Sequence, residues 1–183
     1  VTESPGHNSE YAPWFRKRDE LMNRYCSPKN NVWNTTGFLK MFKKEGSWYE
    51  EMEKMVSNPE PLNLKRSHEY CSQIINSRIT GEPTIINGNV PNHGLITNLS
   101  QNSIVEVPIL IDKNGLQPMM IGDIPPQLAA LDQANINVHE MAVQGFFHAD
   151  PEMIFHAIAY DPLTAAVCSL DEIREMVAEM FEA

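Results

Sequence analysis

The pattern of hydrophobic and polar positions is most regular in the middle of the chain. Every second residue between Val105 and Ile111 is a β-branched aliphatic, and this period of two is typical of a half-buried β-strand. Asn114-Gly115 follows, and Asn-Gly between two apolar runs is a strong hairpin signal because both residues tolerate positive φ. Pro108 cannot donate to a β-ladder, so we expect this strand to be an edge strand or to carry a bulge.

Outside this hairpin the apolar residues recur mainly at the spacing of amphipathic helices. Pro13 suits the first position of a helix, and Ala12 before it is biased toward an extended backbone. Ser-x-x-Glu capping boxes begin at Ser47 and Ser169. The expected helices cover residues 14–25, a segment from Ser47 to a break at Asn58, residues 67–78, a long segment after Pro125-Pro126, one after Asp150-Pro151, and one after Ser169.

These helices have apolar faces, of which the one with Cys71, Ile74 and Ile75 is expected to point inward. The faces are Trp48, Met52, Met55 and Val56; Cys71, Ile74 and Ile75; the stripe that begins at Leu128 and ends at Phe146; and Ile173, Met176, Val177, Met180 and Phe181. Small residues near the Leu128 stripe, such as Ala134 and Gly145, either pack internally or let a helix of a second copy approach. We expect one α+β domain over residues 1–183, with helices around a small antiparallel sheet.

Composition excludes several classes of partner. The net charge of -10, from 24 acidic and 14 basic residues, argues against nucleic acid and anionic membranes, whose binding needs clustered Lys and Arg. No apolar run approaches the roughly 18 residues of a membrane span, and no secretory signal is visible. Three widely spaced cysteines favour reduced thiols in a cytoplasmic protein. The chain begins with Val1, so we expect a larger N-terminal part to precede it.

Few residues are arranged as a metal or nucleotide site. The sequence has no Gly-x-Gly-x-x-Gly and no phosphate-binding loop. His68 and Cys71 stand one helical turn apart, but two ligands do not make a tetrahedral shell, and a helix with a half-buried thiol is favoured. His139, His148 and His156 lack a paired motif, so we interpret them as structural or surface residues.

Two short segments concentrate polar side chains that folding alone does not require. One runs from His7 to Tyr11 before the first helix, and the other from Asn87 to Gly94. Amides, an imidazole and two glycines on the second segment suit hydrogen bonding to a hydroxyl-rich ligand. The alternative is a loop whose Asn and Gly residues only satisfy turn geometry.

Collinear blocks along nearly the whole chain carry a family resemblance. The chain resembles the C-terminal half of the NAD- and metal-dependent glycosidases of glycoside hydrolase family 4, in the α-galactosidase and α-galacturonidase-like branch. The blocks are residues 1–4 with His7 and 9–14; 89–94 with Ile96, Asn98 and Leu99; 105–108; 122–125 with 127–131; 136–138; and 161–166 with 169–173.

The resemblance implies part of an enzyme. The family fold implied for this half is that of the C-terminal domain of lactate and malate dehydrogenases. The resemblance further implies a preceding Rossmann domain that binds NAD and supplies the Cys and His of a divalent metal site, Mn²⁺-like. Cys26, Cys71 and Cys168 therefore inherit no metal role. A small carbohydrate substrate and homo-oligomers are implied as well.

The implied chemistry is the NAD-dependent exception to two-carboxylate glycoside hydrolysis. The sugar is oxidised at C3, a base removes the proton on C2, the aglycone is eliminated, water adds, and the ketone is reduced again. The resemblance assigns the base to Tyr11, which alternatively only anchors the start of a helix. His7, Asn89, Asn92 and His93 are the expected substrate-binding residues.

Two other classes of function remain open from the residues alone. The chain alternatively serves as a non-catalytic carbohydrate-binding or oligomerisation module that kept the fold. The hypothesis that the chain is a fragment of a 2-hydroxy acid dehydrogenase rests on fold analogy alone.

Overall fold

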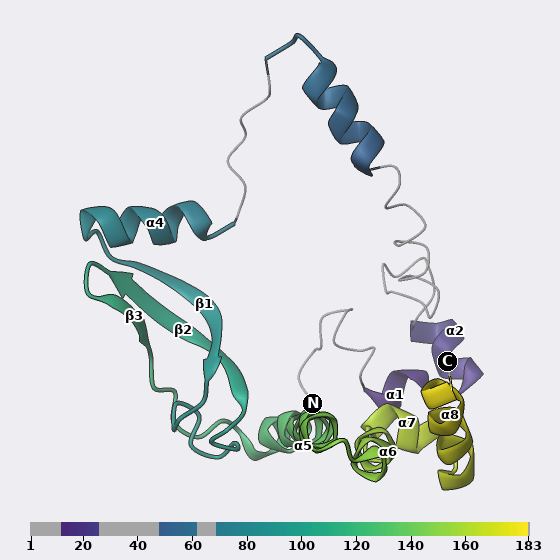
Figure 1. Cartoon of the computed structure of the whole chain (residues 1–183). Helices are drawn as coiled ribbons and strands as arrows, with labels where there is room; N and C mark the ends of the chain where they lie inside the picture. The colour runs from purple at the N-terminus through teal and green to yellow at the C-terminus, as the bar shows by residue number, and fades with distance from the viewer. Residues whose placement is uncertain (1–11, 26–47, 62–68, 183) are drawn as a thin grey trace. The chain divides into compact units, whose positions relative to one another are not determined.

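The computed structural model describes residues 12–25, 48–61 and 69–182 (Figure 1). These residues fall into two compact units, one within residues 2–67 and the other within residues 68–183, and each is described by itself. His7, Tyr11, Cys26 and the capping residue Ser47 lie outside the described residues.

The first unit contains short helices at its start. Ala12 is extended, with φ -105° and ψ 118°, and Pro13 opens α1 (Pro13–Arg16) as expected. The single helix expected over residues 14–25 is instead two helices, because α2 (Asp19–Tyr25) begins anew with an acidic first turn. Acidic residues stabilise the positive end of a helix dipole, which makes Asp19 a start signal.

Residues 48–57 form a further helix in this unit (Figure 1). The four residues of its expected apolar face are exposed. The exposed fractions are 57% for Trp48, 38% for Met52, 51% for Met55 and 81% for Val56. An apolar stripe identifies a helix, but it does not identify a partner that buries the stripe.

The second unit is built on a three-stranded antiparallel sheet in the order β1-β2-β3. The strands are β1 (Thr84–Pro91), β2 (Ile104–Asp112) and β3 (Gly115–Pro118). The sequence pattern predicted β2 and the hairpin but missed β1, whose residues from Asn87 on were assigned to a loop. Asn and Gly are depleted in strands, and β1 is instead determined by its pairing with β2 along its whole length.

Pro108 lies on the central strand, and its one-to-one register with β1 has no bulge, so both expectations, an edge strand or a bulge, are wrong. The Pro108 carbonyl accepts a hydrogen bond of 2.9 Å from the Met119 amide. In an antiparallel ladder the N–H and C=O of one residue point to the same neighbour. The missing N–H of Pro108 therefore faces the β3 side just beyond Pro118, where β3 ends and the ladder no longer needs a donor.

The hairpin turn lies one residue earlier than its Asn-Gly sequence suggests. Asp112 pairs with Gly115, so Lys113 and Asn114 form the turn. The Asp112 carboxylate accepts from the Asn114 amide at 2.7 Å, and these turn hydrogen bonds lower the pKa of Asp112. Arg78, in the helix Cys71–Thr80, donates to the Asp112 and Lys113 carbonyls at 3.1 and 2.9 Å, which fixes this helix against the turn.

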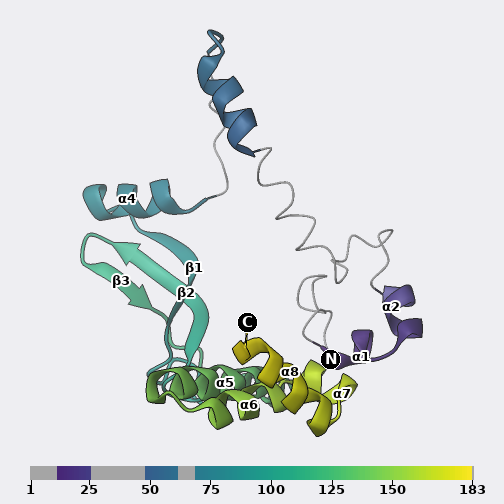
Figure 2. The ribbon, with the colours of Figure 1, turned by 45° about the vertical axis from the view of Figure 1, so that its right-hand side comes forward.

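The core lies on one face of the sheet. The expected period of two in β2 is confirmed, because Val105, Val107, Ile109 and Ile111 are all buried. Helices α4 (Cys71–Thr80) and α5 (Pro126–His148) cover the cluster with partly buried Ile74, Ala129 and Ile136. Figures 1 and 2 show α4 beside the hairpin end of the sheet and α5 beside the other end.

The burial of α4 differs from its expected pattern. Only Ile74 packs against the core, whereas Cys71 is exposed and Ile75 is 52% exposed. Ser77, which is small enough to lie close to the sheet, is the buried residue of this helix at 2% exposure. A small polar residue on a contact face is a signal that a hydrophobic pattern does not contain.

The C-terminal helices begin where the sequence predicts. Asp150 caps α6 (Pro151–Ala159) by accepting from the Glu152 and Met153 amides. Ser169 and Glu172 form the expected reciprocal capping box before α8 (Leu170–Glu182). Between them, α7 (Pro162–Val167) is capped by Asp161.

Helices α5 and α6 approach closely at Gly145. A Cβ atom at this position would lie 2.7 Å from Ile154 Cδ1 and 3.1 Å from the Ile154 backbone nitrogen. Gly145 therefore serves an internal contact, which was one of the two expected roles for the small residues of this helix. Gly145 is the buried residue of α5, the stripe residues before it are half-buried, and Phe146 after it is 77% exposed.

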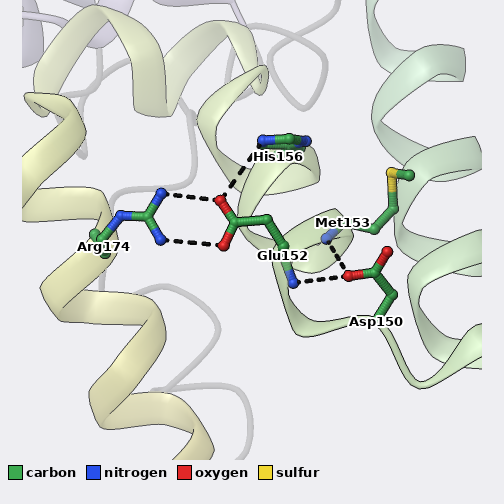
Figure 3. A network of polar contacts seen from close by, with 5 residues as sticks. All are labelled: Asp150, Glu152, Met153, His156 and Arg174. Atoms are coloured by element: carbon green, nitrogen blue, oxygen red, sulfur yellow. Dashed lines mark hydrogen bonds and ion pairs between the residues drawn. The ribbon is translucent and has the colours of Figure 1, made fainter.

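A second cluster joins α6 and α8. Phe155, Ile173 and Val177 are buried, whereas Met176, Met180 and Phe181 of the expected stripe on α8 are exposed. Figure 3 shows the polar contacts beside this cluster. Arg174 donates to both carboxylate oxygens of Glu152 at 3.0 and 3.2 Å and lies 3.9 Å from the centre of the Phe155 ring.

The expected α+β fold class is confirmed, because helices pack on a small antiparallel sheet.

Candidate functional site

The candidate site is the segment that connects β1 to β2, residues 92–103, here called the connecting loop. Its base continues the strand pairing by one step, since the Asn92 amide donates to the Ser103 carbonyl at 2.8 Å. The His93 amide then donates to the Gln101 carbonyl at 3.2 Å, out of register with the ladder. The loop therefore leaves the sheet at Asn92 and returns at Ser103.

Asn92 is the polar centre of this loop. Its side chain is 0% exposed. The amide nitrogen lies 2.9 Å from the Ile96 carbonyl oxygen, 3.3 Å from that of Leu99 and 3.0 Å from that of Ser100. The amide oxygen accepts from the Ile96 N–H at 2.7 Å. An Asn side chain has two N–H donors and one carbonyl acceptor, so all of them are used.

This environment bears on the role expected for Asn92. The Asn92 side chain has no exposed surface and no unused N–H, and its hydrogen bonds all lie within the loop. Its expected contact with substrate stays a prediction. The loop's appearance from sequence, rich in Asn and Gly, gives no indication of which Asn is buried.

His93 follows Asn92 in an unusual backbone conformation. Its φ is 40°, and the next residue, Gly94, has φ 93°. Positive φ is uncommon for residues with a Cβ atom and costs conformational energy. The His93 side chain is exposed, so the loop places an imidazole on the surface by means of a strained turn.

Asn89 lies before the loop, on β1 and on the face of the sheet opposite the core. Its side chain is exposed. Its cross-strand neighbour is Glu106 on β2, also exposed. Opposite residues on one face of an antiparallel pair stand close enough for their side chains to interact. The structure therefore gives the outer face of the sheet an amide and a carboxylate side by side.

Polar contacts also attach the connecting loop to the rest of the unit. The Thr97 hydroxyl donates to the Asp123 carboxylate. Asn98 makes a reciprocal pair of hydrogen bonds with the Ile124 backbone, at 2.8 and 3.1 Å. The Ser100 amide donates to the Gln133 side chain on α5 at 3.1 Å. These anchors were not predicted, because their partners are 26 to 33 residues apart.

The other candidate residues do not converge on a metal. Within the described ranges, no three His, Cys, Asp or Glu side chains come together as a metal-binding group. The His148 ring nitrogen contacts Gln144 at 3.1 Å, and His156 lies 3.8 Å from the Glu152 carboxylate. Both histidines thus have local helix-surface contacts, in agreement with their interpretation as structural or surface residues.

Over the part of the chain that the structure describes, no helix combines the length and the apolar character needed to cross a bilayer.

Comparison with known protein families identifies the class of this chain. The family model for the family 4 glycosyl hydrolase C-terminal domain matches residues 1–164. The chain therefore belongs to this family, and the resemblance seen in its sequence blocks is confirmed.

Individual relatives agree with this assignment. An α-galactosidase of Bacillus subtilis is 36% identical over 100% of this chain, which corresponds to 41% of that protein. The crystal structure of lplD from Bacillus subtilis has a TM-score of 0.77 at 22% identity, covering 94% of this chain and 37% of that one.

A third relative was solved with ligands. A 6-phospho-α-glucosidase from gut microorganisms, in complex with NAD and Mn²⁺, has a TM-score of 0.66 at 18% identity, over 89% of this chain and 38% of that one. At such identities the two solved structures show only that the fold is shared.

The chain spans about two fifths of the length of the relatives it matches.

Proposed function

We propose that this chain is the C-terminal domain of a longer glycosidase that hydrolyses the O-glycosidic bonds of α-galactoside-like substrates. The observation that carries the proposal is the 36% identity to an α-galactosidase over the entire chain. Because the chain corresponds to 41% of that relative, the activity is assigned to the full-length protein and not to residues 1–183 alone.

The proposed reaction proceeds through steps on the sugar ring. The 3-hydroxyl is oxidised to a ketone, which acidifies the proton on C2. A base removes that proton, the aglycone leaves from C1, water adds, and the ketone is reduced again. We assign the base to Tyr11. An unperturbed Tyr has a pKa of about 10, so Tyr11 can act as a base only beside a positive charge that lowers its pKa. His7 is the next candidate.

The described residues contribute to binding. His93 and Asn89 are exposed and carry groups that donate and accept hydrogen bonds, which suits the hydroxyls of a sugar. The carboxylate of Glu106 beside Asn89 adds an acceptor on the same sheet face. We propose that His93 and Asn89 bind hydroxyls of the sugar, and we assign His7 and Tyr11 to the site from the family resemblance alone.

NAD and a divalent metal, Mn²⁺-like, complete the proposal. Family membership and the ligands of one solved relative support both. When bound, the dinucleotide takes and returns a hydride and the metal polarises the carbonyl. No described cluster of side chains fits a metal, so we assign both groups mainly to a Rossmann domain of the full-length protein. A cytoplasmic homo-oligomer is part of the same proposal.

The test uses the full-length protein with NAD, Mn²⁺ and an aryl α-galactoside. We expect turnover that is lost when either NAD or Mn²⁺ is left out. Tyr11→Phe should lower kcat by about 10²- to 10⁴-fold, as expected for loss of a general base. Tyr25→Phe is the matched control, because it removes a phenol oxygen from α2 and should leave kcat unchanged. Sugar binding without turnover in the presence of both additions would reject the proposal and favour the non-catalytic module.

A further inference from the structure

We propose that Asn92 is a positioning residue that acts through His93: its buried amide holds the connecting loop in the conformation that presents the His93 imidazole to the sugar. This inference rests on the proposed function, and it assigns Asn92 a role in substrate binding without contact to substrate. Its basis is the hydrogen bonding of Asn92 together with the backbone conformation of the residue that follows it.

The first step is the ring that Asn92 forms with Ile96. The side chain accepts from the Ile96 N–H at 2.7 Å and donates to the Ile96 carbonyl at 2.9 Å, so it replaces a strand partner for that residue. Only a side chain with a donor and an acceptor on one planar group can make both bonds. Asp lacks the donor, and Gln is longer by one methylene.

The second step concerns the remaining carbonyls. The loop turns the Leu99 and Ser100 carbonyls inward, where the Asn92 nitrogen lies 3.3 and 3.0 Å away. Buried carbonyls without a donor cost free energy. The Ser100 carbonyl also accepts from the Ser103 hydroxyl at 2.7 Å, and the Leu99 carbonyl from the Gln101 side chain at 3.4 Å. Loss of the Asn92 amide should therefore weaken the loop conformation without removing every donor to these carbonyls.

The third step connects the amide to His93. The backbone N–H and C=O of Asn92 are bonded to Ser103 and Leu95, both at 2.8 Å. His93 has φ 40°, a backbone conformation that persists only when the surrounding structure enforces it. When the Asn92 amide is lost, His93 should relax toward negative φ, and its side chain should leave the binding position.

Asn98 provides a matched comparison within the same loop. It forms the same kind of reciprocal ring, with the Ile124 backbone, at 2.8 and 3.1 Å. Unlike Asn92, Asn98 is exposed, so water can replace its hydrogen bonds. Asn98→Ala therefore removes an equivalent pair of bonds without leaving buried groups unsatisfied.

The first experiment is a double-mutant cycle on KM in the full-length protein. His93→Ala and Asn92→Ala should each raise KM by about three- to tenfold, the range of one lost neutral hydrogen bond. The double variant should show no further increase, because both changes remove the same contact. The effect of Asn98→Ala on KM should be the same in the wild-type and His93→Ala backgrounds. A double variant whose KM equals the product of the two single effects would overturn the proposal.

The second experiment does not depend on activity. Hydrogen exchange of the full-length protein should show the amides of His93 and Ile96 losing protection in Asn92→Ala, whereas Asn98→Ala should affect mainly Ile124. Unchanged protection at His93 in Asn92→Ala would refute the positioning role, even if the enzyme is active. If the wild-type protein hydrolyses no glycoside, the proposed function fails and the link of His93 to substrate fails with it. The exchange result then decides only whether Asn92 holds the loop.

Discussion

The sheet with its connecting loop differs from the C-terminal helices in how its side chains are buried and hydrogen-bonded. In the sheet, the core-facing side chains of β2 are 0 to 5% exposed, and the buried polar residue Asn92 has every donor and acceptor paired. In the helices, Phe146, Phe147 and Phe181 are 77, 77 and 60% exposed. Both regions keep apolar side chains exposed, such as Ile85 on β1 at 58%, but the sheet region also buries a side-chain amide whose N–H groups are used within the connecting loop.

The comparison separates two kinds of stabilisation. Helices α6, α7 and α8 begin at side-chain caps, and such caps act within one turn. The sheet and its loop depend on partners that are 4 to 33 residues apart. Substitutions in the loop should therefore have large, cooperative effects, and substitutions at the helix surface should have small, local ones.

The largest effect is expected from Asn92→Asp. The variant keeps the shape of the side chain but places a carboxylate against three carbonyl oxygens in a fully buried position. An uncompensated buried charge costs on the order of 3 to 5 kcal/mol. The free energy of opening at β2, measured by hydrogen exchange, should fall by this amount at neutral pH.

The pH dependence of this variant checks the cause. Burial raises the pKa of a carboxyl above its value in the unfolded chain. The cost is therefore present above the raised pKa and is relieved as the pH falls through it, because the protonated acid regains a donor. A deficit that does not shrink on acidification would show that charge is not the reason.

A middle-sized effect is expected at the contact of α5 with α6. Gly145→Ala places a Cβ atom 2.7 Å from Ile154 Cδ1 and 3.1 Å from the Ile154 nitrogen. Overpacking costs about 1 to 3 kcal/mol, offset by roughly 1 kcal/mol of helix propensity. We expect a net loss of about 1 kcal/mol in chemical denaturation.

A second substitution tests this contact directly. Ile154→Val removes Cδ1, so it should recover part of the loss when it is combined with Gly145→Ala. Val143→Ala on the same helix is the control, because Val143 is 51% exposed and surface changes stay within about 0.5 kcal/mol. Purely additive losses at Gly145 and Ile154 would contradict the close approach.

The smallest effect is expected at the pair of Glu152 with Arg174 (Figure 3). Hydrogen bonding from Arg174 lowers the pKa of Glu152 in the folded state. Its stabilisation is therefore present above the ordinary pKa of Glu and is lost as the pH falls through the lowered value. Because the pair is exposed, salt should weaken it.

Glu152→Gln tests this pair. Its melting temperature should lie slightly below that of the wild type at neutral pH and low salt, and the difference should vanish in acid or in high salt. Glu175→Gln removes a charge from α8 and is the control. A difference that persists in acid would mean that packing, not charge, explains the effect.

What could be predicted from the sequence follows the same division. The caps at Asp150 and Ser169 and the buried period of β2 were correct, because each is encoded within a few residues. The expected apolar faces of the helices are buried only at the residues that pack in a core cluster. Phe146 and Val56 belong to apolar stripes but are exposed, since a stripe does not specify its partner.

The strand β1 and the central place of Pro108 could not be predicted for a different reason. The segment around Asn87 has poor strand propensity and becomes a strand by pairing with β2. Pro108 is tolerated because β3 is short. For the candidate site, the loop was identified from its composition, and His93 and Asn89 stay predictions. The burial of Asn92 depends on carbonyls up to eight residues away, which composition does not encode.

One measurement tests the proposed reaction most directly. The full-length protein is allowed to hydrolyse an α-galactoside in D₂O with NAD and Mn²⁺, and the released sugar is examined at C2 by NMR. If a base such as Tyr11 removes the C2 proton and solvent exchanges it, the product should carry deuterium at C2. A product that keeps only protium at C2, formed at full rate, would contradict the account, because direct displacement at C1 never breaks the C2–H bond.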